Sequence, residues 1–148
     1  DVITTARVIR NPGAGLYDTL IIDSGAQDGI TIGDQVYAHG HILIGSIVEV
    51  GQRTSLVQAL SHPDHTIQAR IISHDLFTEV RGRGAGVFRT EVPRDIDIEV
   101  GTVISQGSHD VIAIVERIQF DPRDPFQEVF SRVPVNLQQL RLVDIVPS

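Results

Sequence analysis

Two stretches of this chain carry the same short pattern at nearly the same spacing. Residues 30–36 read ITIGDQV, and residues 98–104 read IEVGTVI. Residues 47–49 and 114–116 both read IVE, so the two matches are offset by 68 and 67 residues and keep their order. In each copy two apolar residues frame a turn, and a glycine follows them where a backbone shape that penalises a Cβ is expected. A repeat of this kind predicts two copies of one β-rich unit.

Strand signals recur along the whole chain and are separated by turn signals. The apolar residues are mostly Val, Ile and Leu, and β-branched side chains fit a pleated strand better than a helix. No window of about 12 residues keeps the apolar spacing of an amphipathic helix, and only residues 136–140 could form one helical turn. The strands that we predict are 20–23, 43–50, 67–72, 87–92, 111–120, 126–135 and 140–146.

Many short strands at regular spacing, together with the repeat, predict an all-β fold of two small six-stranded β-barrels. We predict a first barrel over residues 1–64, completed by the C-terminal strand 128–148, and a second barrel over residues 65–127. Each half is a small unit with a marginal core, so we expect the two barrels to pack against each other.

Composition excludes several classes of function. The formal net charge is −7, which disfavours a nucleic-acid surface, because phosphate binding needs an excess of basic side chains. The chain has no cysteine, so it can hold neither a disulfide framework nor a thiolate metal site. It begins at Asp1, and we interpret it as part of a longer protein with its targeting segment upstream.

One segment contains the residue types of a serine hydrolase. Ser108, His109 and Asp110 are consecutive, but side chains of adjacent residues on a turn diverge and do not form a relay. We interpret residues 106–110 as a polar turn and keep a serine- or histidine-metal-based hydrolase as the alternative function.

Histidine pairs form the only candidate metal sites in the sequence. The pairs are His39 with His41 and His62 with His65, and the third ligand in either case would be Asp64 or Asp75. A zinc site needs three or four ligands, and Gly40 and Pro63 mark both pairs as turns. We therefore expect no metal and no cofactor.

Residues 81–86 read RGRGAG and lack the Lys-Ser/Thr pair of a phosphate-binding loop. We predict a flexible hairpin connection here. The arginines nearby could together bind a polyanion, a third possible function, and they are Arg81, Arg83, Arg89 and Arg94.

Several segments, in order over nearly the whole chain, resemble the extracytoplasmic domain of the MreC family of rod shape-determining proteins. The segments that carry the resemblance are 17–25 (YDTLIIDSG), 28–36, 44–51, 92–101 (VPRDIDIEVG), 126–129 (FQEV) and 135–143. The barrels of this family look like the two-barrel chymotrypsin-like arrangement without its catalytic triad.

The resemblance implies a non-catalytic scaffold of the cell-wall elongation machinery, outside the cytoplasmic membrane and anchored to it by an upstream transmembrane helix and coiled coil. It also implies partners: a class B penicillin-binding protein, MreD and other elongation-complex members, and a second copy in a homodimer or filament. For partner contacts we predict Tyr17, Pro93, Arg94 and Phe126.

Overall fold

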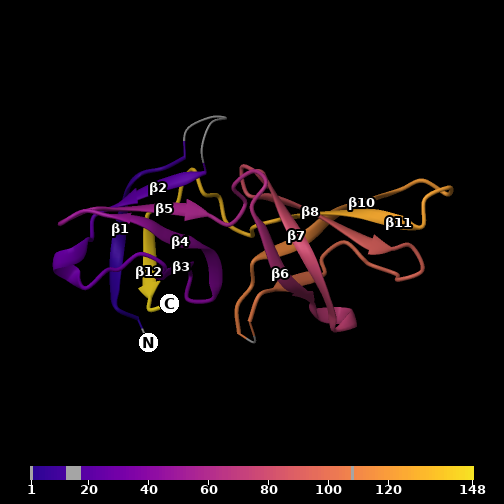
Figure 1. The fold of residues 1–148 in the computed structure, drawn as a ribbon, viewed down its shortest axis with the longest axis horizontal. Helices are drawn as coiled ribbons and strands as arrows, with labels where there is room; N and C mark the ends of the chain where they lie inside the picture. The colour runs from indigo at the N-terminus through magenta and orange to yellow at the C-terminus, as the bar shows by residue number, and fades with distance from the viewer. Residues whose placement is uncertain (1, 13–17, 108) are drawn as a thin grey trace.

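The structure is a computed structural model that describes residues 2–12, 18–107 and 109–148. In these residues the chain forms two closed antiparallel β-barrels of six strands each, side by side along the long axis (Figure 1). The predicted all-β fold of two six-stranded barrels is confirmed. No helix in the described part of the chain has the length and apolar character needed to cross a membrane.

The first barrel combines five strands from the N-terminal part of the chain with its last strand. In neighbour order these are β1 (Thr4–Arg10), β12 (Leu142–Val146), β3 (Gln35–Ala38), β4 (Ile42–Val50), β5 (Ser55–Ala59) and β2 (Thr19–Ile22). The last strand of the chain, β12, thus lies between β1 and β3 in the first barrel.

The second barrel is formed by the central part of the chain. In neighbour order its strands are β10 (Ala113–Phe120), β11 (Phe126–Arg132), β8 (Val87–Pro93), β7 (Leu76–Gly84), β6 (Thr66–Ile71) and β9 (Val103–Ser105). Two short 3-10 turns, Ala26–Asp28 and Ile72–His74, connect strands. Residues 136–140 form a hydrogen-bonded turn, with the Gln139 N–H donating to the Asn136 carbonyl at 3.1 Å.

The predicted start of the completing strand at residue 128 falls inside β11, which continues in the second barrel to Arg132. β11 pairs with β8 without interruption from Phe126 opposite Pro93 to Arg132 opposite Val87. The strand ends where the Val133-Pro134 sequence begins, because proline cannot donate to the ladder. Residues 128–132 thus belong to the sheet of the second barrel.

The two barrels have the same strand order. Strands β1 to β5 correspond to β7 to β11, and each group of five makes the same set of neighbour pairs. The sixth position is filled by β12 in the first barrel and by β6 in the second. Each five-strand unit is thus followed along the chain by a strand that closes the other barrel.

The repeated turn has the same geometry in both copies, as the sequence repeat predicts. Gly33 has φ +95° and Gly101 has φ +96°, a region that favours glycine. The Gly33 N–H donates to Ile47 at 2.9 Å, and the Gly101 N–H donates to Val115 at 2.8 Å. Each turn is therefore tied to the IVE strand of its own copy.

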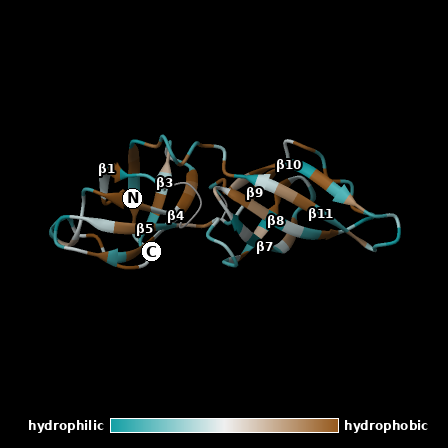
Figure 2. Cartoon of the chain, turned by 90° about the horizontal axis from the view of Figure 1, so that it is seen from above, coloured by the Kyte–Doolittle hydropathy of each residue, from teal (hydrophilic) through white to brown (hydrophobic). Residues whose placement is uncertain are grey.

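Each barrel has its own apolar core, and the strands alternate between hydrophobic and hydrophilic residues (Figure 2). Tyr37 and Leu43 lie on strands of the first barrel but pack into the core of the second. The two cores therefore meet at the junction, as expected for small barrels that support each other.

Candidate partner-binding surface

Two of the predicted contact residues, Pro93 and Phe126, lie directly opposite each other on β8 and β11. Arg94 follows at the same end, where its N–H donates to the Pro125 carbonyl at 2.9 Å. Its guanidinium donates to the carbonyls of Asp121 and Pro122, so it supports the β10–β11 connection. Tyr17 lies outside the described residues. The structure thus brings three of the four predicted residues together at the far end of the second barrel.

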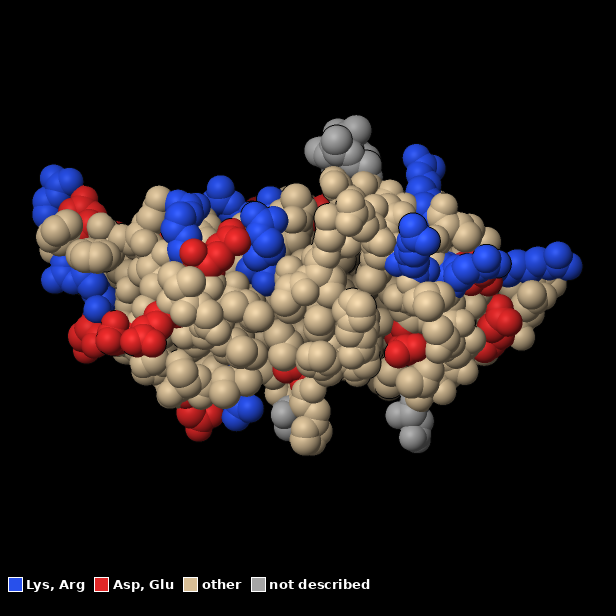
Figure 3. Space-filling view, turned by 180° about the vertical axis from the view of Figure 1, so that it is seen from behind, with Lys and Arg blue, Asp and Glu red and all other residues tan. Residues whose placement is uncertain are grey.

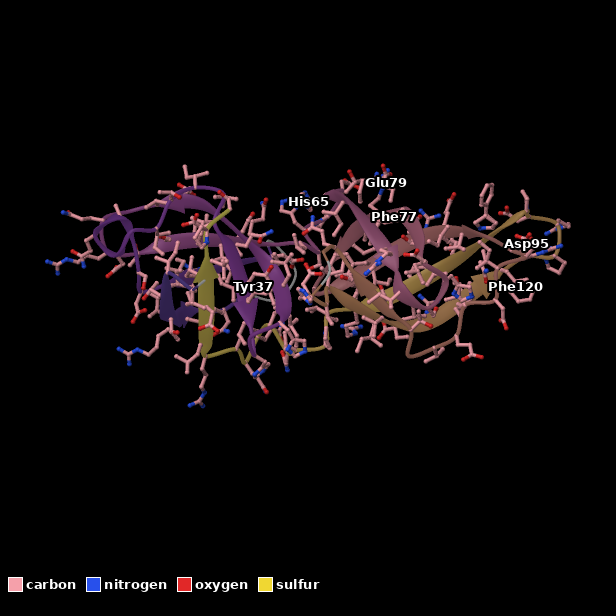
Figure 4. The ribbon with its side chains drawn as sticks, turned by 90° about the horizontal axis from the view of Figure 1, so that it is seen from below. Tyr37, His65, Phe77, Glu79, Asp95 and Phe120 are labelled. Carbon is pink, nitrogen blue, oxygen red and sulfur yellow. The ribbon has the colours of Figure 1, made fainter. Side chains whose placement is uncertain are left out.

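Exposed apolar side chains lie on the outer face of the second barrel. Pro93 and Phe126 are exposed, Phe126 to 45 %. Phe77 on β7 is 71 % exposed, and Figure 4 shows it projecting from the barrel beside Glu79. The ladder places Arg81 opposite Arg89, and Thr90 Oγ1 donates to the Glu79 carbonyl at 2.8 Å. The printed ladder between β7 and β8 reaches only to Arg81 opposite Arg89, and Phe77 is paired on its other side with Arg70 of β6. Phe77 is thus a separate exposed aromatic residue on the outside of the same barrel, and Pro93 and Phe126 form a paired apolar contact.

A charged row lies beside the apolar pair of Pro93 and Phe126. Glu91 pairs in register with Glu128, and both carboxylates contact the guanidinium of Arg89, at 3.1 Å in the case of Glu91. The hydrogen bond with Glu128 is the main cause that raises the pKa of Arg89 above its ordinary value, so this side chain stays charged. The arginine holds two like charges together and orders the middle of the face.

A third row is basic and aromatic. Phe130 is 6 % exposed and lies opposite Arg89 on β8 and Arg117 on β10. The guanidinium of Arg117 lies 4.1 Å from the Phe130 ring centroid, and that of Arg83 lies 5.7 Å from it. These are cation–π distances, so the two arginines cover the ring while their charged ends stay at the surface.

The glycine-rich hairpin is held against the first barrel and is not a free connection. Ala85 and Gly86 form its tip with φ +55° and +82°, the positive values of a tight hairpin turn. The Ala85 N–H donates to both carboxylate oxygens of Asp18, at 3.0 and 2.9 Å, and the Gly86 N–H donates to Ser61 Oγ at 3.0 Å. Ser61 Oγ in turn donates to Asp18 at 2.9 Å. We call this group the Asp18 latch.

The latch is almost closed to solvent, because Asp18 is 8 % and Ser61 is 2 % exposed. A buried carboxylate is tolerated only when its oxygens accept hydrogen bonds, as they do here. A second contact, between backbone groups, joins the barrels where Leu43 N–H donates to the Val111 carbonyl and Val111 N–H donates to the His41 carbonyl, both at 2.9 Å.

The charged side chains are unevenly distributed over the surface. Seen from behind, they gather toward the two ends of the molecule, and the surface over the middle is mostly uncharged (Figure 3).

The alternative sites do not assemble in the described residues. Asp110 Oδ1 accepts hydrogen bonds from Ser105 Oγ at 2.7 Å and from the N–H groups of Gln106 and Gly107, which makes this segment a polar turn. Ser108 lies outside the described residues, and His109 is exposed. Within the described part of the chain, no three His, Asp or Glu side chains converge as a metal site would need.

The arginines that suggested a polyanion site are dispersed. Arg81 lies 3.9 Å from Asp64, Arg89 is engaged by Glu91 and Glu128, and Arg94 binds carbonyl groups. Of the four, only Arg83 has no carboxylate or carbonyl partner among the described residues.

Sequence reasoning missed Phe77 and the Asp18 latch. The signal for Phe77 was present, because Leu76 to Arg81 alternates as an exposed strand does, but the glycines that follow obscured β7. The latch joins residues separated by 43 and 67 positions, and no local pattern indicates such a contact.

The fold and this surface define a tandem β-barrel domain whose two barrels are joined by buried polar and apolar contacts and whose second barrel presents an ordered outer face. A family model described as "Rod shape-determining protein MreC, barrel core" matches residues 8–147. The chain therefore belongs to the MreC family of rod shape-determining proteins.

Individual relatives agree with this assignment. The cell shape-determining protein MreC of Haemophilus influenzae is 28 % identical over 133 residues, which are 84 % of this chain and 38 % of that protein. The chain thus spans well under half the length of this relative. The crystal structure of MreC from Pseudomonas aeruginosa has a TM-score of 0.86 at 22 % identity, covering 97 % of both chains.

A more distant structural match is a complex of a penicillin-binding protein (PBP2) and MreC from Helicobacter pylori. Its TM-score is 0.59 at 8 % identity, covering 98 % of this chain and 99 % of that one. At these identities the solved structures establish a shared fold.

Proposed function

We propose that this domain is a non-catalytic scaffold of the cell-wall elongation machinery that binds a class B penicillin-binding protein through the outer face of its second barrel. The observation that carries the proposal is the exposed pair of Pro93 and Phe126, with Phe77 exposed on the same barrel, beside the charged group of Arg89, Glu91 and Glu128. Exposed aromatic anchors next to ordered charges are typical of specific interfaces. The H. pylori MreC was solved in complex with PBP2, which supports this class of partner.

The same proposal places the domain outside the cytoplasmic membrane, anchored through a segment upstream of this chain. A related MreC domain, 18 % identical, is described as the major periplasmic domain of a cell shape-determining filament. Further partners in the proposal are MreD, other elongation-complex proteins and a second copy of the protein. The proposed role needs no reacting side chain, and it makes use of a stable surface.

Rigidity of the two-barrel body supports a scaffold role. The Asp18 latch and the backbone contact at Val111 connect the barrels at two separate places. An interface backbone that moves little on binding avoids the entropic cost of ordering. These contacts fix the position of the second barrel, and with it the outer face, relative to the first barrel.

The test is calorimetry with the purified domain and the extracytoplasmic part of the class B penicillin-binding protein of the same organism. We expect saturable binding that Phe77→Ala and Phe126→Ala each weaken by about tenfold or more, the size of an aromatic hot spot. Ile32→Ala is the matched control, because Ile32 is 68 % exposed on the first barrel, away from this face. Its affinity should equal that of the unchanged protein.

Two results would contradict the proposal. The first is that the penicillin-binding protein, at high micromolar concentration, binds neither this domain nor a version of it dimerised through its upstream segment. That result would exclude the penicillin-binding protein as a partner. Binding that the Phe77 and Phe126 changes leave intact, in proteins that keep their thermal stability, would move the interface to another face.

A further inference from the structure

The closing strand of the first barrel comes from the far end of the chain. β12 lies between β1 and β3, and its register places Asp144 opposite Thr5 and Ile145 opposite Val36. The chain reaches it from the second barrel, and the two termini end up near each other on the first barrel (Figure 1). β12 is thus a terminal strand whose pairing partners are all distant in sequence.

β12 contributes a separable set of contacts to the first barrel. Val143 is 2 % exposed and Ile145 is fully buried in the first core, and Leu137 and Leu140 pack there too. Asn11 Nδ2 donates to the carbonyls of Leu137 and Leu140, both at 2.9 Å. All these contacts join residues 137–146 to the first barrel and would be identical if that segment came from another copy.

The segment that leads to β12 is suited to an extended path. It starts after β11 with Val133, whose N–H donates to Gly86 at 2.9 Å, and continues through Pro134, which is exposed. Proline restricts the residue before it to extended backbone, which disfavours a tight reversal at this point. Val133 is buried in the first core and Val135 packs against it, so the residues whose path and contacts change when the following strand leaves its own barrel are Val133 to Asn136.

We propose that two copies of this chain associate by exchanging β12, each copy closing the first barrel of the other. The closed monomer and the exchanged dimer form the same strand pairs and bury the same side chains of residues 137–146, so they differ mainly in the path and packing of residues 133–136 and in association entropy. The chain already uses this architecture internally, because β6 and β12 each close the barrel of the other five-strand unit. The proposal does not depend on binding of a penicillin-binding protein.

Single cysteines can detect the exchange, because the chain has none of its own. Thr5 and Asp144 are register partners whose side chains lie 2.7 Å apart, within the reach of a disulfide. Thr5→Cys and Asp144→Cys proteins are mixed, unfolded and refolded together at high concentration, and then oxidised. We expect a covalent heterodimer, because a cysteine at 5 in one copy meets a cysteine at 144 only if β12 has crossed.

A matched pair controls for random oxidation. Gln68 and Glu79 are also exposed register partners, but they lie on β6 and β7, which are consecutive and joined by a short turn. Mixed Gln68→Cys and Glu79→Cys proteins should give no heterodimer above background. The double variant Thr5→Cys/Asp144→Cys, oxidised as a monomer before refolding, should remain a monomer.

A yield of heterodimer from the Thr5 and Asp144 pair no greater than that of the control pair would overturn the proposal. If the two single variants fail to refold, the double variant decides the matter under reducing conditions. When refolded at high concentration and then oxidised, it should give disulfide-linked dimers, and oxidised monomers alone would equally overturn the exchange. Neither outcome bears on binding of a penicillin-binding protein, which is measured with the unchanged chain.

Discussion

The two barrels share their strand order and differ in what they expose. In both copies of the repeated turn the first apolar residue is buried, with Ile30 at 3 % and Ile98 at 4 %. The residue two positions later is exposed in both, with Ile32 at 68 % and Val100 at 66 %. The element that defines the repeat has thus kept its packing as well as its backbone.

The difference lies in the hairpins. In the second barrel, β10 and β11 extend together to Phe120 opposite Gln127, and β7 and β8 carry the glycine-rich tip that reaches the first barrel. These two hairpins supply the exposed apolar residues Phe77, Pro93 and Phe126 and the groups that meet Asp18 in the latch. The comparison teaches that the repeated elements form the cores, and that the elements which diverged supply the contacts with other surfaces.

The equivalence of the two turns is tested most directly by replacing the buried residue of each turn. Ile30→Ala and Ile98→Ala should each lower the free energy of unfolding by about 4 kcal/mol, the cost of a cavity left by a large aliphatic side chain. Urea denaturation followed by circular dichroism measures both. Because each barrel is closed by a strand from the other unit, both variants should unfold in one transition. Two separate transitions would show that the barrels are independent.

Exposed members of the same turns serve as controls. Ile32→Ala and Val100→Ala remove apolar side chains that lie largely in solvent, and they should change stability by less than about 0.5 kcal/mol. If only one of the two variants lost much of its free energy of unfolding, the side chain replaced in that turn would have packing contacts that the other turn lacks.

The approach of the β7–β8 hairpin to the first barrel requires Gly82. A Cβ added there would lie 2.2 Å from the His62 carbonyl oxygen and 2.6 Å from that of Ser61. Gly82→Ala should therefore lower stability by about 3 kcal/mol, since backbone atoms cannot move aside as a flexible side chain can. Gly40→Ala is the control, because nothing lies within 4 Å of its added Cβ. It should lose only about 1 kcal/mol, for its positive φ of 81°.

The latch tests the junction itself. Asp18→Ala leaves the Ala85 N–H without its acceptor in a buried place and should reduce stability by about 2 kcal/mol. Asp18→Asn keeps one oxygen that can accept, so its loss should be about half as large. Equal losses for the two variants in urea denaturation would show that the charge of the carboxylate, and not its hydrogen bonds, holds the hairpin.

The smallest effect concerns alkaline pH. Burial, and then the negative charge of Asp110, raise the pKa of Tyr37 above its ordinary value of 10.0. The folded protein therefore resists ionisation of Tyr37. Stability is unaffected below pH 10 and falls as the pH rises past that value, because the unfolded chain releases the proton more easily. Tyr37→Phe should fall less steeply than the unchanged protein over this range. If stability falls with the same slope against pH in both proteins, ionisation of Tyr37 does not contribute to the alkaline loss of stability.

Much of the fold could be predicted from local patterns. The strand predictions at 20–23, 43–50, 67–72 and 87–92 each fall within one or two residues of an observed strand. The strands that were missed include β3, β5 and β9, of four, five and three residues. So few residues show too little alternation to distinguish a strand from a loop.

The surface was less accessible to prediction. The family resemblance predicts Pro93, Arg94 and Phe126 as contact residues, and the structure brings them together because β8 and β11 are neighbours, although 33 residues separate Pro93 from Phe126. Phe77 lies on the same barrel because β7 is the next strand of the same sheet. A row across a sheet is a property of register, which a single strand does not reveal.

The sequence by itself determined that this chain is β-rich, that it contains one unit twice, and that each copy has a glycine turn followed by an IVE segment. These features depend on side-chain alternation and on backbone angles within a few residues. Only the tertiary structure decided that the fifth strand of each unit is followed by a strand that closes the other barrel, and that Asp18 meets the hairpin at Ala85. Those outcomes depend on which segments, distant in sequence, pack together with the lowest free energy. That free energy is set by the contacts of the whole folded chain and not by any short segment.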